Sequence, residues 1–361
     1  LFLFIFLTLF PFNKFLFTQS NIIKDLNFFS LVNIISLFLM FLLLFLSFLK
    51  IKIVYIFYFI ISVYSILMII ILFDQKKKII IKSPLLITFF LFSLICIFLN
   101  TSYQFELGWD GFNWKEKTNF FYNGGYLLDI NKSTSFYQNY PHLGTYIWAF
   151  FWKNSFLNYE HIGRLFYDYI YITSLFAIIL NFKNVSDLKK IFIFILIFFC
   201  TFDKGLGGYQ DYLIFSILTI FASILVKHYF KKNNSIFYLT YLLAGILLPW
   251  IKNEGFVYSL FLIIIFFIYE LEFIKDKKNY LKYLFSILII FSLLVRITLN
   301  GIILDENTLF RSNLVNFIQN GINWNIILTK IYYILFYTMN SFFKYPIWLF
   351  NFFGLFASLY F

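Results

Sequence analysis

The longest polar stretch of this chain brings carboxylates and aromatic residues together between two apolar runs. It begins at Trp109 and Asp110, continues through Glu116, and ends at Tyr140 and His142. An aromatic shell beside an apolar run raises the pKa of a carboxyl group toward the range of a general base. Asp110 is therefore a candidate base, and the alternative is a solvated aspartate in an ordinary loop.

Two shorter stretches also place charges beside turns at the ends of apolar runs. Asp203 and Asp211 flank a segment that contains Tyr209 and three glycines, which permit a ligand to approach the backbone closely. Lys252 and Glu254 lie at a second junction between apolar runs. Charges so near hydrocarbon are unfavourable unless they are paired or functional, so this pair either neutralises itself or belongs to a site.

Several cations in the same stretches have the chemistry to hold a phosphate group. Arginine binds such an anion through two parallel donors, whereas lysine acts as a point charge. The candidates are Arg164, Lys204, Lys252 and Arg311. Lone basic residues near a membrane usually serve only as headgroup anchors, so both interpretations stay open. A divalent metal at Asp110, Glu116 and His142 fits the residue types, but no spacing specifies one, and a metal requirement is left open.

The elements that must position these residues are transmembrane helices. Of 361 residues, 61% are hydrophobic and 13% are charged, and no soluble fold could bury so much apolar surface. A hydrocarbon core of about 30 Å takes roughly 20 residues per helix, which leaves room for about 11 to 12 spans. We therefore predict an all-α, polytopic transmembrane bundle that forms a single domain over residues 1–361. The 57 phenylalanines are also typical of an AT-rich genome and are not counted as chemistry.

Apolar runs bounded by charges predict the individual helices. These runs are 29–49, 53–73, 84–100, 162–182, 190–202, 211–226, 236–250, 255–271, 283–300, 324–341 and 346–361, with a further run at 1–17. Cys96 and Cys200 lie inside such runs and form neither a metal pattern nor a disulfide framework.

Basic loops predict the orientation of the bundle. The net charge of +12 comes mainly from lysines in short loops, which is typical of the cytoplasmic side of a membrane protein and not of nucleic-acid binding. Four such loops lie within 74–82, 183–190, 227–232 and 275–282. Alternation then places 101–161, 203–210, 252–255 and 301–323 on the outer side. The run 143–152 is about half the length of a span, so we expect amphipathic, interfacial helices within the outer loop 101–161.

The arrangement of these motifs resembles the polytopic glycosyltransferases of the GT-C superfamily, which include protein O-mannosyltransferases and lipid A aminoarabinose transferases. The resemblance covers about residues 84–272. Trp109-Asp110-Gly111-Phe112 looks like the aspartate motif that opens the first outer loop in these enzymes. Tyr140-Pro141-His142-Leu143 looks like the element before the next span, and Glu160-His161-Ile162-Gly163-Arg164 is similar to the segment that opens it. The turns around Tyr209 and Lys252 also look like outer turns of bacterial relatives.

This resemblance implies transfer of a sugar from a polyprenyl-phosphate-linked donor to a glycan, lipid or protein acceptor. It places the protein in a bacterial inner (plasma) membrane, in contact with membrane lipids, with its active face outward. Asp110 would be the catalytic base. The expected substrate-binding residues are Trp109, Glu116, Tyr140, His142, Arg164, Asp203, Tyr209, Asp211, Lys252 and Glu254.

Two other classes of function remain open from the residues. A polytopic transporter or lipid-linked sugar flippase would carry charges within its spans, and Arg296 lies within one of the predicted helices. A non-catalytic subunit of cell-envelope polysaccharide assembly would use the same outer face only for binding.

Overall fold

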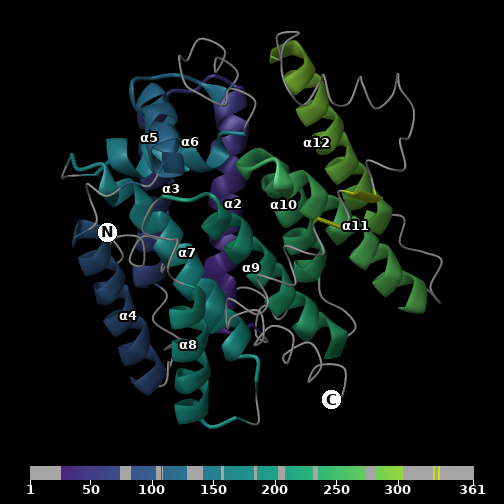
Figure 1. Ribbon diagram of the computed structural model, residues 1–361. Coiled ribbons are helices and arrows are strands. Elements are labelled where there is room, and N and C mark those ends of the chain that lie inside the picture. The colour runs from purple at the N-terminus through teal and green to yellow at the C-terminus, as the bar shows by residue number, and fades with distance from the viewer. Residues whose placement is uncertain are drawn as a thin grey trace. The chain divides into compact units, whose positions relative to one another are not determined.

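The computed structural model contains eleven α-helices and no strand within the residues that it describes (Figure 1). These residues are 26–73, 83–102, 107, 109–127, 141–155, 158–182, 185–201, 208–230, 235–273, 281–303, 328–329 and 332–333. The helices are α2 (Phe28–Phe48), α3 (Ile53–Phe73), α4 (Ser83–Ser102), α5 (Trp109–Tyr122), α6 (Leu143–Lys153), α7 (His161–Ile179), α8 (Asp187–Thr201), α9 (Asp211–Phe230), α10 (Ser235–Ile251), α11 (Glu254–Phe273) and α12 (Leu281–Ile303). The chain divides into two compact units, Leu1–Asn300 and Gly301–Phe361, and the site lies in the first.

The all-α prediction is confirmed for the described residues. Nine of the predicted apolar runs coincide to within a few residues with helices α2–α4 and α7–α12. The predicted runs 1–17 and 346–361, and most of 324–341, lie outside the described residues. Two helices, α2 and α7, are long and apolar enough to cross a membrane by length and composition.

Helix α7 is the centre of the first unit, where it packs against α2, α4, α6 and α9 (Figure 1). All of its residues except Ile178 are buried. Amide side chains tie it to its neighbours: Asn33 of α2 donates to the carbonyl of Thr173 at 3.0 Å, and Thr173 donates back to the Asn33 side chain at 2.6 Å. Such reciprocal bonds satisfy polar groups inside an apolar bundle and fix helix register.

Aromatic rings fill the space between α4, α7 and α8. The ring of Phe92 meets Phe194 and Phe198 edge to face, with centroids 4.9 and 4.8 Å apart. Phe176 of α7 contacts Phe194 at 4.3 Å. In this ring cluster (Phe92, Phe176, Phe194 and Phe198) the two contacts of Phe92 have the edge-to-face geometry that aromatic quadrupoles favour.

The short helix α6 lies beneath α5 and against α7, α3 and α10. Its eleven residues match the predicted run, but residues 143–151 are buried on every side. The sequence predicts instead a helix with one face in the outer leaflet. The difference arises because α5 covers α6: the Tyr122 ring packs on Trp152 at 4.3 Å, and the ammonium of Lys153 lies 4.3 Å from the Tyr122 ring centroid.

Candidate functional site

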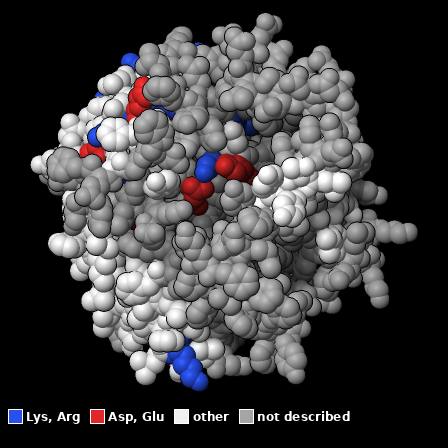
Figure 2. Space-filling model, in the orientation of Figure 1, with Lys and Arg blue, Asp and Glu red and all other residues white. Residues whose placement is uncertain are grey.

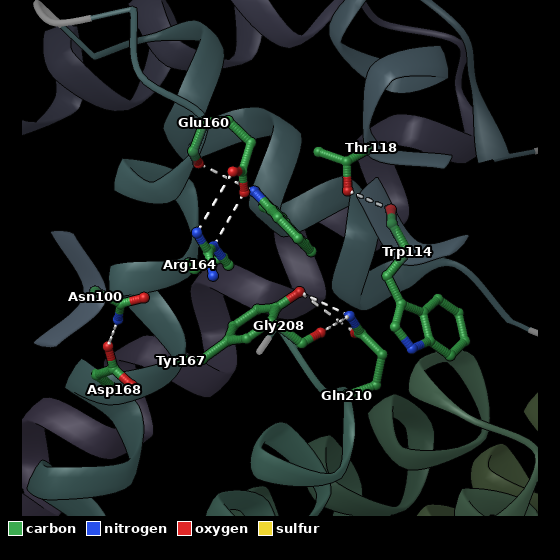
Figure 3. Close-up of polar contacts among 10 residues, drawn as sticks. Asn100, Trp114, Thr118, Glu160, Arg164, Tyr167, Asp168, Gly208 and Gln210 are labelled. Atoms are coloured by element: carbon green, nitrogen blue, oxygen red, sulfur yellow. Dashed lines mark hydrogen bonds and ion pairs between the residues drawn. The ribbon is translucent and has the colours of Figure 1, made fainter. Parts of the chain in front are cut away.

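Four helices, α6, α7, α9 and α11, begin at one end of the first unit, and their first turns are joined by side chains. The hydroxyl of Tyr167 donates to the carbonyl of Gly144 at 2.8 Å. The amide of Gln210 donates to that hydroxyl at 3.0 Å (Figure 3). Gly144 lies directly against the Gln210 side chain, so a larger residue there would require that side chain to move. Helix N-termini carry partial positive charge and unpaired N–H groups, so this end favours anions.

The Lys252 cluster (Asp211, Lys252 and Glu254) lies at this end. The ammonium of Lys252 contacts both carboxylate oxygens of Asp211, at 2.9 and 3.2 Å, and lies 3.7 Å from Glu254 Oε1. Two sequence-predicted motifs, separated by about 40 residues, are thus brought into contact. Figure 2 shows acidic and basic side chains gathered in a small area of one face. Because two carboxylates flank one cation, the cluster has a net negative charge and its half-exposed carboxylates face solvent.

The turn between α10 and α11 that carries Lys252 is held by close backbone packing. A Cβ on Gly255 would lie 1.9 Å from the carbonyl oxygen of Leu248, so only glycine fits. Arg296 of α12 donates to the carbonyl of Pro249 at 3.4 Å and to Asn253 Oδ1 at 3.5 Å. Arg296 is therefore a nearly buried cation at the site end, beside the Lys252 cluster.

Lys117 is a second buried cation near this end, on the face of α5 that packs inward. Its ammonium lies 4.9 Å from the Trp114 ring centroid, and its side chain is fully buried. Burial lowers the pKa of Lys117 to about 7; Glu116 opposes this shift and Arg296 adds to it. Position 110 precedes Trp114 by four residues and Lys117 by seven, so the helical period brings it to the same face.

Arg164 is fully buried in a two-point ion pair at the start of α7. Its Nε lies 3.0 Å from Glu160 Oε1 and its Nη2 3.4 Å from Oε2, while its guanidinium lies 5.6 Å from the Trp148 ring centroid (Figure 3). The Trp148 indole donates to the Glu160 carbonyl at 3.1 Å. Burial raises the pKa of Glu160, and Arg164 opposes that shift. Gly208, with φ +72°, leaves room for this pair, because a Cβ there would lie 2.8 Å from the Trp148 ring.

The remaining predicted site residues are placed as follows. Glu116 is exposed on α5, His142 is buried before α6, and Tyr209 is half-buried before α9. The backbones of Trp109 and Asp110 open α5, but their side chains lie outside the described part of the structure, as do Tyr140, Asp203, Lys204 and Arg311. Within the described residues no three His, Cys, Asp or Glu side chains come together as a metal site. The metal set with Asp110 is therefore not tested.

Three features of this end were not predicted from the sequence. They are the burial of Lys117, the hydrogen bond of Gln210 to Tyr167, and the contacts of Arg296 with the α10–α11 turn. Lys117 belongs to a Lys-Glu-Lys run that looks solvated when read along the chain. The signal that could have identified it is its position three residues after Trp114, on the apolar face of the helix.

Comparisons of the chain with family models, curated proteins and solved structures yield no match. The likeness to the GT-C superfamily therefore rests on the sequence motifs themselves.

Proposed function

We propose that this protein is a multi-pass membrane glycosyltransferase of the GT-C type. It would transfer a sugar from a polyprenyl-phosphate-linked donor to an acceptor on the outer face of the plasma membrane. The observation that carries the proposal is that the Lys252 cluster and the buried Arg296 lie together at the turn between α10 and α11, at one end of an apolar helix bundle. The motifs that resemble the superfamily lie at the same end.

Lipid-facing stripes on several helices support a multi-pass arrangement. Helix α4 exposes Ile87, Leu91, Leu94 and Phe98, which follow one another at helical spacing and are 53–70% exposed. Helix α12 likewise exposes large apolar residues along one face, Phe291 among them at 62%. Continuous apolar stripes of this kind need a lipid or protein cover, and lipid suits helices of about 20 residues.

The charged residues at the site end form two groups, one suited to the phosphate and one suited to the sugar of a lipid-linked donor. Arg296 is buried beside the turn that precedes α11, and Lys117 is buried within α5; cations of this kind are suited to a phosphate group. Asp211 and Glu254 present half-exposed carboxylates, which are suited to accept hydrogen bonds from sugar hydroxyls. Lys252 and Arg164, which the sequence suggested as phosphate ligands, are instead engaged by carboxylates. We assign them to holding the turns in place.

In the proposed reaction Asp110 removes the proton from the acceptor hydroxyl. The acceptor oxygen then forms a bond to the anomeric carbon, and the bond from that carbon to the phosphate oxygen breaks. The leaving polyprenyl phosphate keeps the electron pair, and the cations stabilise its added charge. Positions 110 and 117 are seven residues apart, which is two turns of a helix, and this spacing supports the division of roles.

The test uses the full-length protein in lipid vesicles with a panel of polyprenyl-phosphate hexoses and pentoses. Release of polyprenyl phosphate is measured by mass spectrometry, with membrane extract as the acceptor source. Asp110→Asn should slow release about 100-fold or more, as expected for loss of a general base. Asp187→Asn, in the first turn of α8 and paired there with Lys190, is the matched control and should keep the parental rate. Full activity of Asp110→Asn at normal expression would reject the proposal.

One observation favours a transporter as the second candidate, and it is the buried carboxyl of Asp168 within α7. Acidic residues inside spans are common in proton-coupled transporters. Counterflow of a labelled lipid-linked sugar across sealed vesicles, without release of polyprenyl phosphate, would favour this class.

A further inference from the structure

Asp168 and Asn100 form an isolated polar contact deep between α7 and α4. Both side chains are fully buried, and the amide nitrogen of Asn100 contacts Asp168 Oδ2 (Figure 3). Asp168 is the eighth residue of α7, two turns along the helix from Glu160 and one turn from Arg164. The contact is not part of the proposed reaction, because it lies one turn deeper than the Arg164 pair.

Two acceptor atoms of this contact lack a hydrogen-bond donor among the described residues. Among the described residues neither Asp168 Oδ1 nor Asn100 Oδ1 has a hydrogen-bond partner, although both atoms are buried. Both are acceptors, so a second donor is missing from the contact. A buried polar atom left without a partner is unfavourable by about 1–3 kcal/mol. An ionised carboxylate in an apolar surrounding is more unfavourable still.

A single proton satisfies both acceptors at once. A carboxylic acid donates through its O–H and accepts through its carbonyl oxygen, while an amide donates through its N–H and accepts through its own carbonyl. An acid and an amide placed end to end therefore form a ring closed by two hydrogen bonds. In this contact the Asn100 N–H to Asp168 bond is present, and the proton would supply the reverse bond from Asp168 Oδ1 to Asn100 Oδ1.

We propose that Asp168 and Asn100 form a buried proton-binding site that locks α4 to α7. The titratable groups that face it are Arg164 on its own helix and Cys96, one turn before Asn100 on α4. With Asp168 neutral, the guanidinium of Arg164 stays with Glu160 at the site end. If Asp168 lost its proton, two carboxylates would compete for the Arg164 guanidinium. Glu160 lies one turn before Arg164, and Asp168 lies one turn after it.

Infrared spectroscopy of the full-length protein in lipid tests the proposal, because a protonated carboxyl has a C=O band that a carboxylate lacks. The parent should show such a band at pH 7 that persists to pH 9. Asp168→Asn should remove it while keeping two hydrogen bonds between the side chains, and so should remain folded. Asn100→Ala should leave the band but shift it, because the carbonyl loses its partner.

Two controls separate this site from other groups. Glu160→Gln should leave the Asp168 band in place, since Glu160 is a separate carboxyl, only partly buried, at the start of α7. Asn33→Ala removes a comparable buried amide and should not shift the band. Absence of a protonated carboxyl at pH 7, or a band that Asp168→Asn leaves unchanged, would overturn the proposal and leave Asp168 as an ionised partner of Arg164. Should Asp168→Asn not accumulate, the Asn100→Ala shift alone decides.

Discussion

Replacing Lys117 with methionine should stabilise the protein and at the same time impair its activity. The side chain is fully buried on the inward face of α5, where it contacts the Trp114 ring. Methionine has a similar length and no charge, so it fills the same space without the need to desolvate an ammonium group. If Lys117 binds the donor phosphate, the same change removes a ligand.

The size of the effect follows from the pKa of Lys117. Its ordinary value of 10.5 is lowered to about 7 by burial. Below pH 7 both the folded and the unfolded chain bind the proton, and the burial penalty is complete. Between pH 7 and 10.5 the unfolded chain binds it and the folded chain does not, so stability rises with pH. At about 1.4 kcal/mol for each pH step, the rise over this whole interval is about 5 kcal/mol.

The assay is reversible unfolding in mixed micelles, followed by tryptophan fluorescence between pH 6 and pH 9. The parent should gain roughly 3 kcal/mol between pH 7 and pH 9, and Lys117→Met should lose that slope. Lys153→Met is the matched control, because its ammonium also lies over an aromatic ring but the residue is exposed. An unchanged slope in Lys117→Met would refute the account of Lys117 as a buried cation.

Four further predictions concern the ion pair, the turn and the topology. Glu160→Gln and Arg164→Met should each destabilise the fold by about 3–5 kcal/mol, and the double variant should be closer to the parent, as a double-mutant cycle in the same unfolding assay would reveal. Because the pKa of Glu160 is raised, the folded chain holds that proton longer, so stability should fall as pH rises from 4.5 toward the folded pKa, and Glu160→Gln should flatten this part of the curve. Gly255→Ala should prevent accumulation of folded protein, measured by size-exclusion elution, because the added methyl meets a backbone carbonyl. In a chain whose native cysteines are replaced, Asn253→Cys should react with an impermeant maleimide from outside and Ser186→Cys only from inside; labelling of both from one side would contradict the predicted path.

The helices were largely predictable because their signal is local. Apolar runs ended by lysines or by polar turns predicted α2, α3 and α10 to within one residue at each end, since helices in apolar surroundings have few other ways to satisfy their backbone. The contact between the turns of Asp211 and Lys252 was also foreseeable, because alternation of basic loops places both on one side.

The environment of each charge was less predictable, since it depends on packing between distant helices. Lys252 and Arg164 looked like available cations in the sequence, yet each is engaged by carboxylates. Lys117 looked solvated and is buried. The burial of α6 could not be read from its composition either, because an interfacial helix and a short covered helix share the same apolar content.

The ring cluster of α4, α7 and α8 distinguishes phenylalanines that are costly to exchange from those that are not. Mutational bias can supply phenylalanine in place of other apolar residues, and at exposed positions such as Phe98 that exchange changes little. Within the cluster, however, each ring is held by the edge or face of another, as Phe92 is by Phe194 at an interplanar angle of 88°. A return to leucine there would keep the hydrophobicity and lose the directional contact. An exchange at one of these positions therefore alters the packing between neighbouring helices.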